Sequence, residues 1–166
     1  MPHNIFLSVF LSKSPILYKK QSLFKLYLSD VGMLTSEHGM STKRMLISRD
    51  KSLNGGGIFE NAIAQTLHSK GYELYYYNSN RIGELDFIIE TGGDAIPIEV
   101  KSGKKYSVHS ALNNCVNNPD YEIKEAIVFA DCNVSREDKI TYMPLYMSMF
   151  MDASIGDDGV VEKIVF

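Results

Sequence analysis

The chain has 166 residues, and its 45% hydrophobic content is enough to build the core of one ordinary domain. The formal net charge is −3, so the totals exclude a broadly basic nucleic-acid-binding protein, and any contact with nucleic acid has to be local. Cys115 and Cys132 lack partners at metal-like spacing, which argues against a disulfide framework or a zinc site and favours reduced thiols in a cytoplasm. The apolar run from Ile5 to Leu11 is far shorter than the ~20 residues of a spanning helix, so we expect a cytoplasmic protein with no membrane segment.

The first 50 residues are predicted to form a separate N-terminal segment, and residues 51–166 to form the main domain. Within the N-terminal segment, "LFKLYL" at 23–28 has the composition of a strand, and Ser29 or Asp30 can cap a short helix after it. Residues 41–57 are polar and basic and end in three glycines, which predicts a loop and the internal boundary.

The main domain is predicted to contain a helix, three strands, a second helix and a fourth strand. The first helix covers 58–71, where apolar residues recur at helical spacing and Gly71 provides a stop. Short runs rich in β-branched or aromatic residues predict the three strands, and glycines at 92 and 93 supply a turn between the last two of them. These strands are 72–78, 84–90 and 95–101; the second helix is 107–116, the fourth strand is 125–131, a strand running into a helix follows at 139–151, and a last strand is expected at 160–166.

Charged residues interrupt the hairpin formed by the second and third of these strands. Alternation along a strand places Glu99 and Lys101 on one face, opposite Ile96, Ile98 and Val100. On the neighbouring strand, alternation places Asp86 on the face opposite Leu85, Phe87 and Ile89, and the turn can bring Asp86 beside Glu99. Two carboxylates that close repel each other and raise each other's pKa unless a cation lies between them.

Glu60 is predicted to join these residues from the preceding helix. It lies on the edge of the inward apolar stripe, where a carboxylate needs a partner because its burial costs several kcal/mol. Glu60, Asp86, Glu99 and Lys101 would then offer three oxygen donors and one ammonium at one rim of the sheet. Oxygen ligands favour Mg²⁺ or Mn²⁺ over zinc.

These motifs resemble the PD-(D/E)XK nuclease superfamily, which includes many restriction and repair endonucleases. The resemblance rests on "GELD" at 83–86, on "EVK" at 99–101, thirteen residues after the Asp, and on the Glu in the preceding helix. More narrowly, "FKLYLSDVGML", "GGGIFENAIAQTL" and "IPIEVKSGK" resemble the C-terminal domain of unknown function of predicted AAA+ ATPases of bacteria and archaea, over roughly residues 22 to 130. The implied fold is α/β, with a restriction-endonuclease-like α-β-β-β-α-β core whose mixed central sheet is flanked by helices.

The resemblance implies a metal-dependent hydrolase of phosphodiester bonds in nucleic acid, DNA before RNA. Asp86, Glu99 and the carbonyl of Val100 would ligate Mg²⁺ or Mn²⁺, Glu60 would complete the shell directly or through water, and Lys101 would orient the attacking water. Two points depart from the superfamily pattern: Glu84 and Leu85 replace the Pro before the Asp, and Glu84 is an alternative ligand.

The partners implied are a nucleic acid and an ATPase, or a second copy of the chain. The sequence has no G-x-x-x-x-G-K-[ST] motif, so we expect no ATP site of the P-loop kind in this chain. The alternative function is a non-catalytic binding or oligomerisation module that retains the nuclease fold. Single residues also have a structural alternative to a role in the site. Glu99 and Lys101 could be an ordinary pair on an exposed strand, and Glu60 could form an ion pair. The tyrosines at 75–77 could pack in the protein instead of stacking on bases.

Overall fold

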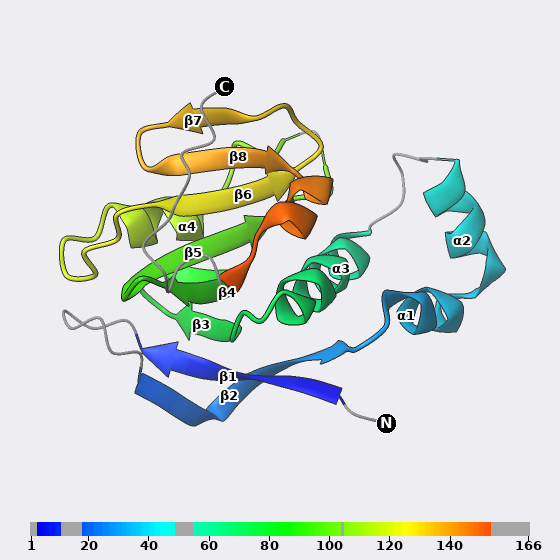
Figure 1. The fold of residues 1–166 in the computed structure, drawn as a ribbon, viewed down its shortest axis with the longest axis horizontal. Coiled ribbons are helices and arrows are strands. Elements are labelled where there is room, and N and C mark those ends of the chain that lie inside the picture. Colours follow the sequence, from blue (N-terminus) through cyan, green and yellow to red (C-terminus); the bar gives the residue numbers. More distant parts are fainter. Residues whose placement is uncertain (1–2, 11–17, 49–54, 104, 154–166) are drawn as a thin grey trace.

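The protein is an α/β structure built on one mixed sheet of eight strands, shown in Figure 1. The computed structural model describes residues 3–10, 18–48, 55–103 and 105–153. The strands lie in the order β2-β1-β3-β4-β5-β6-β8-β7. Their bounds are β1 (His3–Phe10), β2 (Tyr18–Leu28), β3 (Tyr75–Ser79), β4 (Gly83–Thr91), β5 (Asp94–Val100), β6 (Ala126–Ala130), β7 (Ser135–Glu137) and β8 (Ile140–Pro144).

Helices cover both faces of the sheet. The α-helices are α1 (Val31–Glu37), α2 (Gly39–Ile47), α3 (Gly56–Ser69) and α4 (Ser110–Val116), and a 3₁₀ helix, η1 (Leu145–Phe150), follows β8. Apolar residues of α3, such as Leu67, belong to the same cluster as Ile127 and Phe129 of β6, whereas Leu112 of α4 belongs to a second cluster with Ala126 and Val128. Because alternate residues of β6 belong to the two clusters, α3 and α4 lie on opposite faces.

The predicted order of helix, three strands, helix and strand is confirmed as α3-β3-β4-β5-α4-β6. The β4–β5 pair is the antiparallel hairpin expected from its two glycines, with Phe87 opposite Ile98. Both glycines have positive φ, 59° at Gly92 and 80° at Gly93, a conformation that glycine adopts without steric cost. β5 and β6 then run parallel, with α4 as the connection between them.

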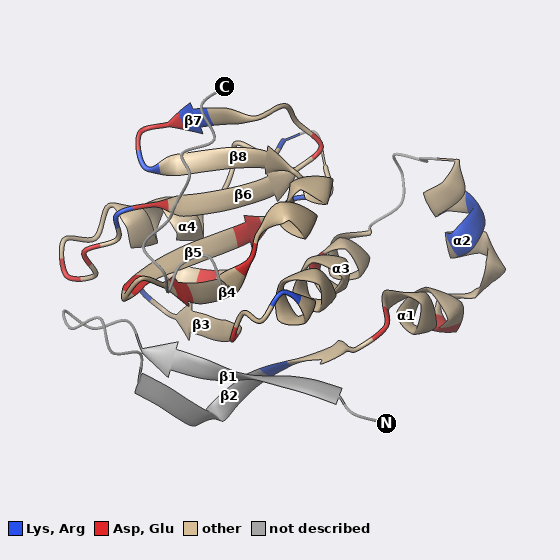
Figure 2. Ribbon diagram, viewed as in Figure 1, with Lys and Arg blue, Asp and Glu red and all other residues tan. Residues whose placement is uncertain are grey.

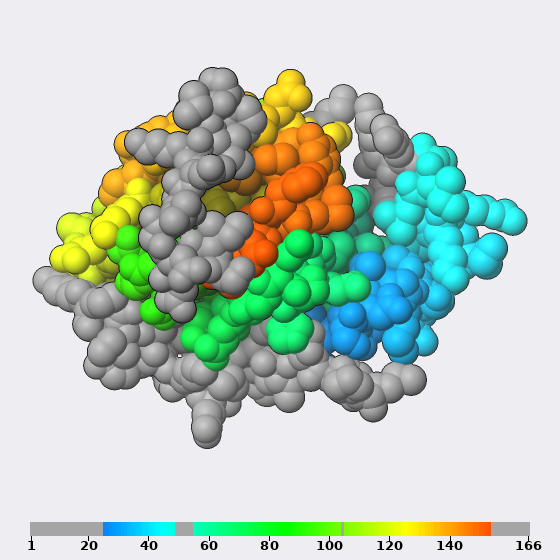
Figure 3. All heavy atoms as spheres, in the orientation of Figure 1, coloured from blue at the N-terminus to red at the C-terminus, as the bar shows by residue number. Residues whose placement is uncertain are grey.

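The prediction of a loop over 41–57 is wrong in its first half. Residues 39–47 form α2, and α3 begins at Gly56. After Gly39, α2 contains neither glycine nor proline, so nothing in its backbone opposes a helix although much of its surface is polar. None of its residues is buried, and α1 and α2 form a lobe at one side of the molecule (Figure 3).

The N-terminal strands belong to the same sheet as the rest of the chain. β1 pairs with β2 on one side and, over Leu7 and Ser8, with β3 on the other. The predicted division at residue 50 stays a prediction, since residues 49–54 lie outside the described residues. The strand expected at 160–166 also lies outside them.

A β-bulge interrupts β4 at the predicted site. Tyr75 of β3 pairs with Ile88, but Tyr77 pairs with Leu85, so β4 has one residue more than β3 between these two pairs. The expectation that Leu85, Phe87 and Ile89 share a face is therefore wrong: Leu85 packs in the cluster of α4, and the other two pack in the cluster of α3.

Among the described residues, none of the helices has both the length and the apolar character needed to cross a membrane. The tyrosines at 75–77 are all at least nine-tenths buried, which agrees with packing and not with base stacking. Figure 2 shows that, among the described residues, the basic segments of the ribbon are scattered among acidic ones.

Candidate functional site

Three carboxylates from two elements meet around one ammonium group. The Nζ atom of Lys25, on β2, lies 2.7 Å from Oε1 of Glu60, 2.8 Å from Oε1 of Glu84 and 3.5 Å from Oδ1 of Asp86. Glu60 comes from α3, and the other two come from β4. The same Nζ lies 5.2 Å from the centre of the Tyr76 ring, within the range of a cation–π contact. We call Lys25 and these three carboxylates the Lys25 cluster.

Hydrogen bonds join the end of β2 to α3 and so hold Lys25 close to the carboxylates of the Lys25 cluster. Asn61, which is 2% exposed, accepts a hydrogen bond from the backbone N–H of Leu28 (2.8 Å) and donates one to its carbonyl (3.0 Å). The hydroxyl of Tyr27 donates to Oε1 of Glu60, and its ring centroid lies 5.4 Å from that of Phe87. Since Lys25 and Tyr27 are two positions apart on a strand, both side chains reach the same helix.

Asp86 lies at the bulge of β4, where the strand changes the direction of its side chains. Its Oδ2 accepts a hydrogen bond from the backbone N–H of Val100 on β5, at 2.8 Å. Burial raises the pKa of Asp86 to about 7, with the negative charges of Glu99 and Glu60 adding to the rise. The Val100 hydrogen bond and the Lys25 charge lower this pKa but do not cancel the rise. Near neutral pH, Asp86 therefore exists in both protonation states.

The pKa of Lys25 is also raised. Burial alone would lower it, because a charged amine is poorly solvated inside a protein, but hydrogen bonds to Glu60 and Glu84 outweigh that effect. The pKa of Tyr27 rises as well, through its burial and the nearby charge of Glu60. The tyrosine therefore acts as a hydrogen-bond donor to the glutamate.

Glu99 and Lys101 form a second pair at the end of β5. Nζ of Lys101 lies 2.6 Å from Oε1 of Glu99, so the predicted common direction of the two side chains is confirmed. Glu99 is only 8% exposed, which rules out the alternative of an ordinary pair on an exposed strand. Its Oε2 is buried and accepts no hydrogen bond from the described residues. A buried carboxylate oxygen without a donor is costly, and this oxygen is a natural ligand for a cation.

The structure brings the four predicted site residues to one region but into two groups. Glu60 and Asp86 share Lys25, and the alternative of an ion pair at Glu60 is therefore confirmed. Glu99 and Lys101 pair separately. Asp86 and Glu99 lie next to the register pair Phe87–Ile98, each on its own strand, and they are close enough for the charge of Glu99 to raise the pKa of Asp86. Within the described residues, no three Asp, Glu, His or Cys side chains are grouped so as to hold a metal ion as they stand.

The donor chemistry nevertheless fits a hard divalent cation. The region supplies carboxylate oxygens from Asp86 and Glu99, one of them unpartnered, and no sulfur or imidazole ligand accompanies them among the described contacts. Glu60 and Glu84 are bound to Lys25, which also lies 3.5 Å from Asp86.

Sequence reasoning missed Lys25, Tyr27 and Asn61. Lys25 and Tyr27 belong to "FKLYL", a predicted strand and part of a motif of the resemblance, and alternation within that strand indicates that both side chains point the same way. For Asn61, the signal is that a polar residue occupies a position on the buried face of α3.

One of the comparisons with known proteins identifies a family. The family described as "Domain of unknown function (DUF4143)" matches residues 55–147, which is more than half of the chain. Neither a curated protein nor a solved structure was found to match the chain. The matched region begins before α3 and ends within η1, so it contains Glu60, Asp86, Glu99 and Lys101 but not Lys25. By this match, the chain belongs to the family of the Domain of unknown function (DUF4143).

Proposed function

We propose that the protein is a metal-dependent nuclease that hydrolyses phosphodiester bonds in nucleic acid, with DNA as the preferred substrate. The observation that carries the proposal is the buried carboxylate of Glu99, whose Oε2 has no hydrogen-bond partner among the described residues and whose charge lies close enough to Asp86 to raise the pKa of Asp86. The order α3-β3-β4-β5-α4-β6 supports it, because the nuclease superfamily that the motifs resemble has this restriction-endonuclease-like core.

Mg²⁺ or Mn²⁺ bound here would supply a Lewis acid for the phosphate and lower the pKa of a bound water. Asp86, Glu99 and the carbonyl of Val100 would hold the ion, with Glu60 as a further ligand directly or through water. Asp86 is already oriented for this role, since its other oxygen is fixed by the Val100 N–H.

Lys101 would position the attacking water and stabilise negative charge on the phosphate. Its ammonium is held beside Glu99 at 2.6 Å and its side chain is 28% exposed, so it is ordered and still within reach of a substrate. By the resemblance, the activity would serve an AAA+ ATPase module as partner, or two copies of the chain would act together.

The second candidate is a non-catalytic binding or oligomerisation module that keeps the fold. The specific observation in its favour is Lys25, since an ammonium already neutralises part of the carboxylate charge. The scattered distribution of basic residues over the described part of the chain (Figure 2) also favours it, because a nuclease must hold a polyanion.

The test is calorimetric titration of Mn²⁺ into the parent and into Asp86→Ala, with circular dichroism to show that both are folded. Asp94→Ala is the matched control, because Asp94 is a carboxylate of β5 that pairs with the exposed Lys124. We expect binding by the parent and by the control, and loss of binding in Asp86→Ala. Double- and single-stranded DNA are then incubated with each protein and Mg²⁺ or Mn²⁺.

Cleavage that depends on both the metal and Asp86 would establish the nuclease. A folded parent that binds no Mn²⁺ at millimolar concentration would contradict the metal site and leave the binding module as the function. Binding without cleavage of either DNA would retain the metal site and contradict DNA as the substrate.

A further inference from the structure

Lys25 belongs to the N-terminal part of the chain, but its ammonium lies where the carboxylates of α3 and β4 converge. Its side chain is 21% exposed, and those of Glu60 and Asp86 are 20% and 17% exposed. Two carboxylates as buried as these cannot remain close together, with the half-exposed Glu84 beside them, without a positive charge between them. In the described structure, Lys25 is that charge.

Among the described side chains, the charges near the site do not balance with lysines alone. Four described carboxylates, Glu60, Glu84, Asp86 and Glu99, accompany two described ammonium groups, Lys25 and Lys101. An excess of negative charge therefore remains when all four carboxylates are ionised, and the buried Oε2 of Glu99 has no donor among the described residues. The region attracts a cation even with Lys25 in place.

Lys25 also uses the oxygen atoms that such a cation would need. Oε1 of Glu60 accepts hydrogen bonds from both Lys25 and Tyr27, and Oδ1 of Asp86 faces the same ammonium at 3.5 Å. A divalent cation bound by Glu60 and Asp86 would meet the positive charge of Lys25 at close range, which is strongly unfavourable.

We propose that Lys25 is a tethered counter-ion that competes with a divalent cation for Glu60 and Asp86. The inference rests on the metal site of the proposed function and adds the residue that sets its affinity. When the cation binds, the ammonium leaves these two carboxylates and keeps Glu84, which already lies 2.8 Å away and whose side chain is 48% exposed. Glu84 is thus the second partner of Lys25 and not a metal ligand.

The test measures Mn²⁺ affinity by calorimetry in variants that remove or keep the charge at position 25. Lys25→Met and Lys25→Gln remove the charge, and the Gln amide can still donate a hydrogen bond to Glu60 if the Met variant does not fold. We expect both variants to bind Mn²⁺ about tenfold more tightly than the parent or better, the size of effect that couplings between neighbouring sites commonly reach. Lys25→Arg keeps the charge and is expected to bind as the parent does.

Lys124→Met is the matched control, because it also removes a lysine from an ion pair, at an exposed position on Asp94. Its Mn²⁺ affinity is expected to equal that of the parent. The role of Glu84 is tested in the Lys25→Met background, where Glu84→Gln is expected to leave the affinity unchanged. A loss of affinity there would make Glu84 a ligand and overturn its assignment as the partner of Lys25.

The outcomes separate this inference from the proposed function. If the parent binds Mn²⁺ through Asp86 and Lys25→Met binds no more tightly, the counter-ion role of Lys25 is overturned, while the metal site of the proposed function is supported. If the parent binds no Mn²⁺ but Lys25→Met does, the counter-ion is supported and the parent is not a metal-dependent enzyme under these conditions. If neither protein binds at millimolar Mn²⁺, both proposals are overturned.

Discussion

Asp86 is the residue whose chemistry depends most on its surroundings. It accepts one backbone hydrogen bond, lies near Lys25, and still has its pKa raised to about 7, because burial and two neighbouring glutamates disfavour its ionised form. In the unfolded chain the pKa of Asp86 returns to the usual aspartate value of 3.8. Between these two values the folded protein holds a proton at Asp86 that the unfolded chain has lost.

The contribution of Asp86 to stability is therefore expected to fall as the pH rises. Below about pH 4 the residue is protonated in both states, and above about pH 7 it is ionised in both, so its ionisation lowers stability progressively between these limits. We expect Asp86→Asn, which keeps an oxygen for the Val100 N–H, to match the parent at pH 4. At pH 8 it should be more stable by about 2 kcal/mol or more.

Urea unfolding of parent and variant at pH 4, 6 and 8 measures this difference. Asp94→Asn, at a partly exposed carboxylate, is the control and should stay within about 0.5 kcal/mol of the parent at each pH. An Asp86→Asn protein less stable than the parent at pH 8 would contradict the raised pKa.

At the level of elements, the contact between β2 and α3 decides whether the site exists. Glu60 lies on α3, but its two hydrogen-bond donors, Lys25 and Tyr27, lie on β2. Polar contacts that join the two elements include these and the pair of bonds between Asn61 and Leu28. A second contact continues into α1, where the N–H of Val31 donates to Gln65 at 2.9 Å.

Replacing Asn61 should weaken this junction. In Asn61→Leu both backbone groups of Leu28 lose their partner in a partly buried place, and we expect a loss of about 2–3 kcal/mol in the free energy of unfolding. Asn113→Ala, at an exposed position of α4, is the matched control and should change stability by no more than about 0.5 kcal/mol.

Thermal or urea unfolding measures the loss, and hydrogen exchange at the amides of β2 locates it. Faster exchange is expected at Leu28, whose N–H donates to Asn61 in the parent. A variant with unchanged stability and unchanged exchange would show that the junction does not depend on Asn61.

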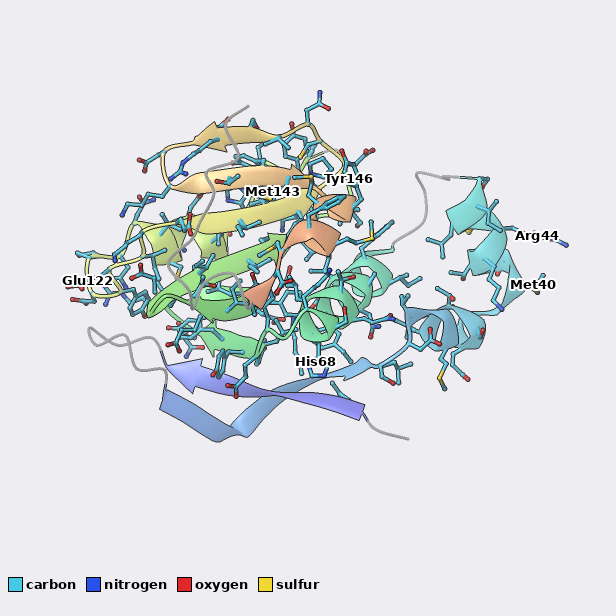
Figure 4. The ribbon with its side chains drawn as sticks, viewed as in Figure 1. Met40, Arg44, His68, Glu122, Met143 and Tyr146 are labelled. Carbon is cyan, nitrogen blue, oxygen red and sulfur yellow. The ribbon has the colours of Figure 1, made fainter. Side chains whose placement is uncertain are left out.

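At the level of the whole molecule, the sheet separates two hydrophobic clusters. One lies under α4 and includes Leu85 and Leu112; the other lies under α3 and η1 and includes Leu67 and Phe87. On the α3 side, methionines fill part of the space: Met143, labelled in Figure 4 near Tyr146, packs on the cluster together with Met147 and Met151. These three methionines are partly buried against the cluster, where a flexible side chain can fill irregular space, while Met149 is exposed.

Because the clusters lie on opposite faces, truncations in each should act independently. Leu67→Ala and Leu112→Ala each delete a side chain with no exposed surface, and each is expected to cost about 2–5 kcal/mol. The double variant should lose the sum of the two costs within about 0.5 kcal/mol, measured by urea unfolding. Ile47→Ala on α2 is the control, since Ile47 is 84% exposed. A large departure from additivity would show that the two faces are packed as one cooperative unit through the sheet.

The lobe formed by α1 and α2 adds little to either cluster. Neither helix buries a residue, and Met40 and Arg44 project from α2 on the side away from the sheet (Figure 4). Its helices therefore depend on local hydrogen bonds, such as that of the Asp30 side chain to the N–H of Gly32, and on the contact of α1 with α3.

Local pattern was enough to predict the central elements from the sequence. Helical spacing gave α3, short apolar runs gave β3, β4, β5 and β6, and two glycines gave the hairpin, because these signals depend only on neighbouring residues. The same patterns placed Glu60, Asp86, Glu99 and Lys101 at one end of the sheet. The common direction of Glu99 and Lys101 followed from the two-residue repeat of a strand.

Tertiary structure alone decided how the site is assembled. The bulge in β4 depends on its pairing with β3, so no alternation rule within β4 could show that Leu85 and Phe87 pack on opposite sides. The position of Lys25 depends on a strand pairing and on an Asn61 contact that joins residues 33 positions apart. Sequence thus determined which charged residues are available, while long-range packing determined which of them neutralise one another, because electrostatic pairing depends on distance in space and not along the chain.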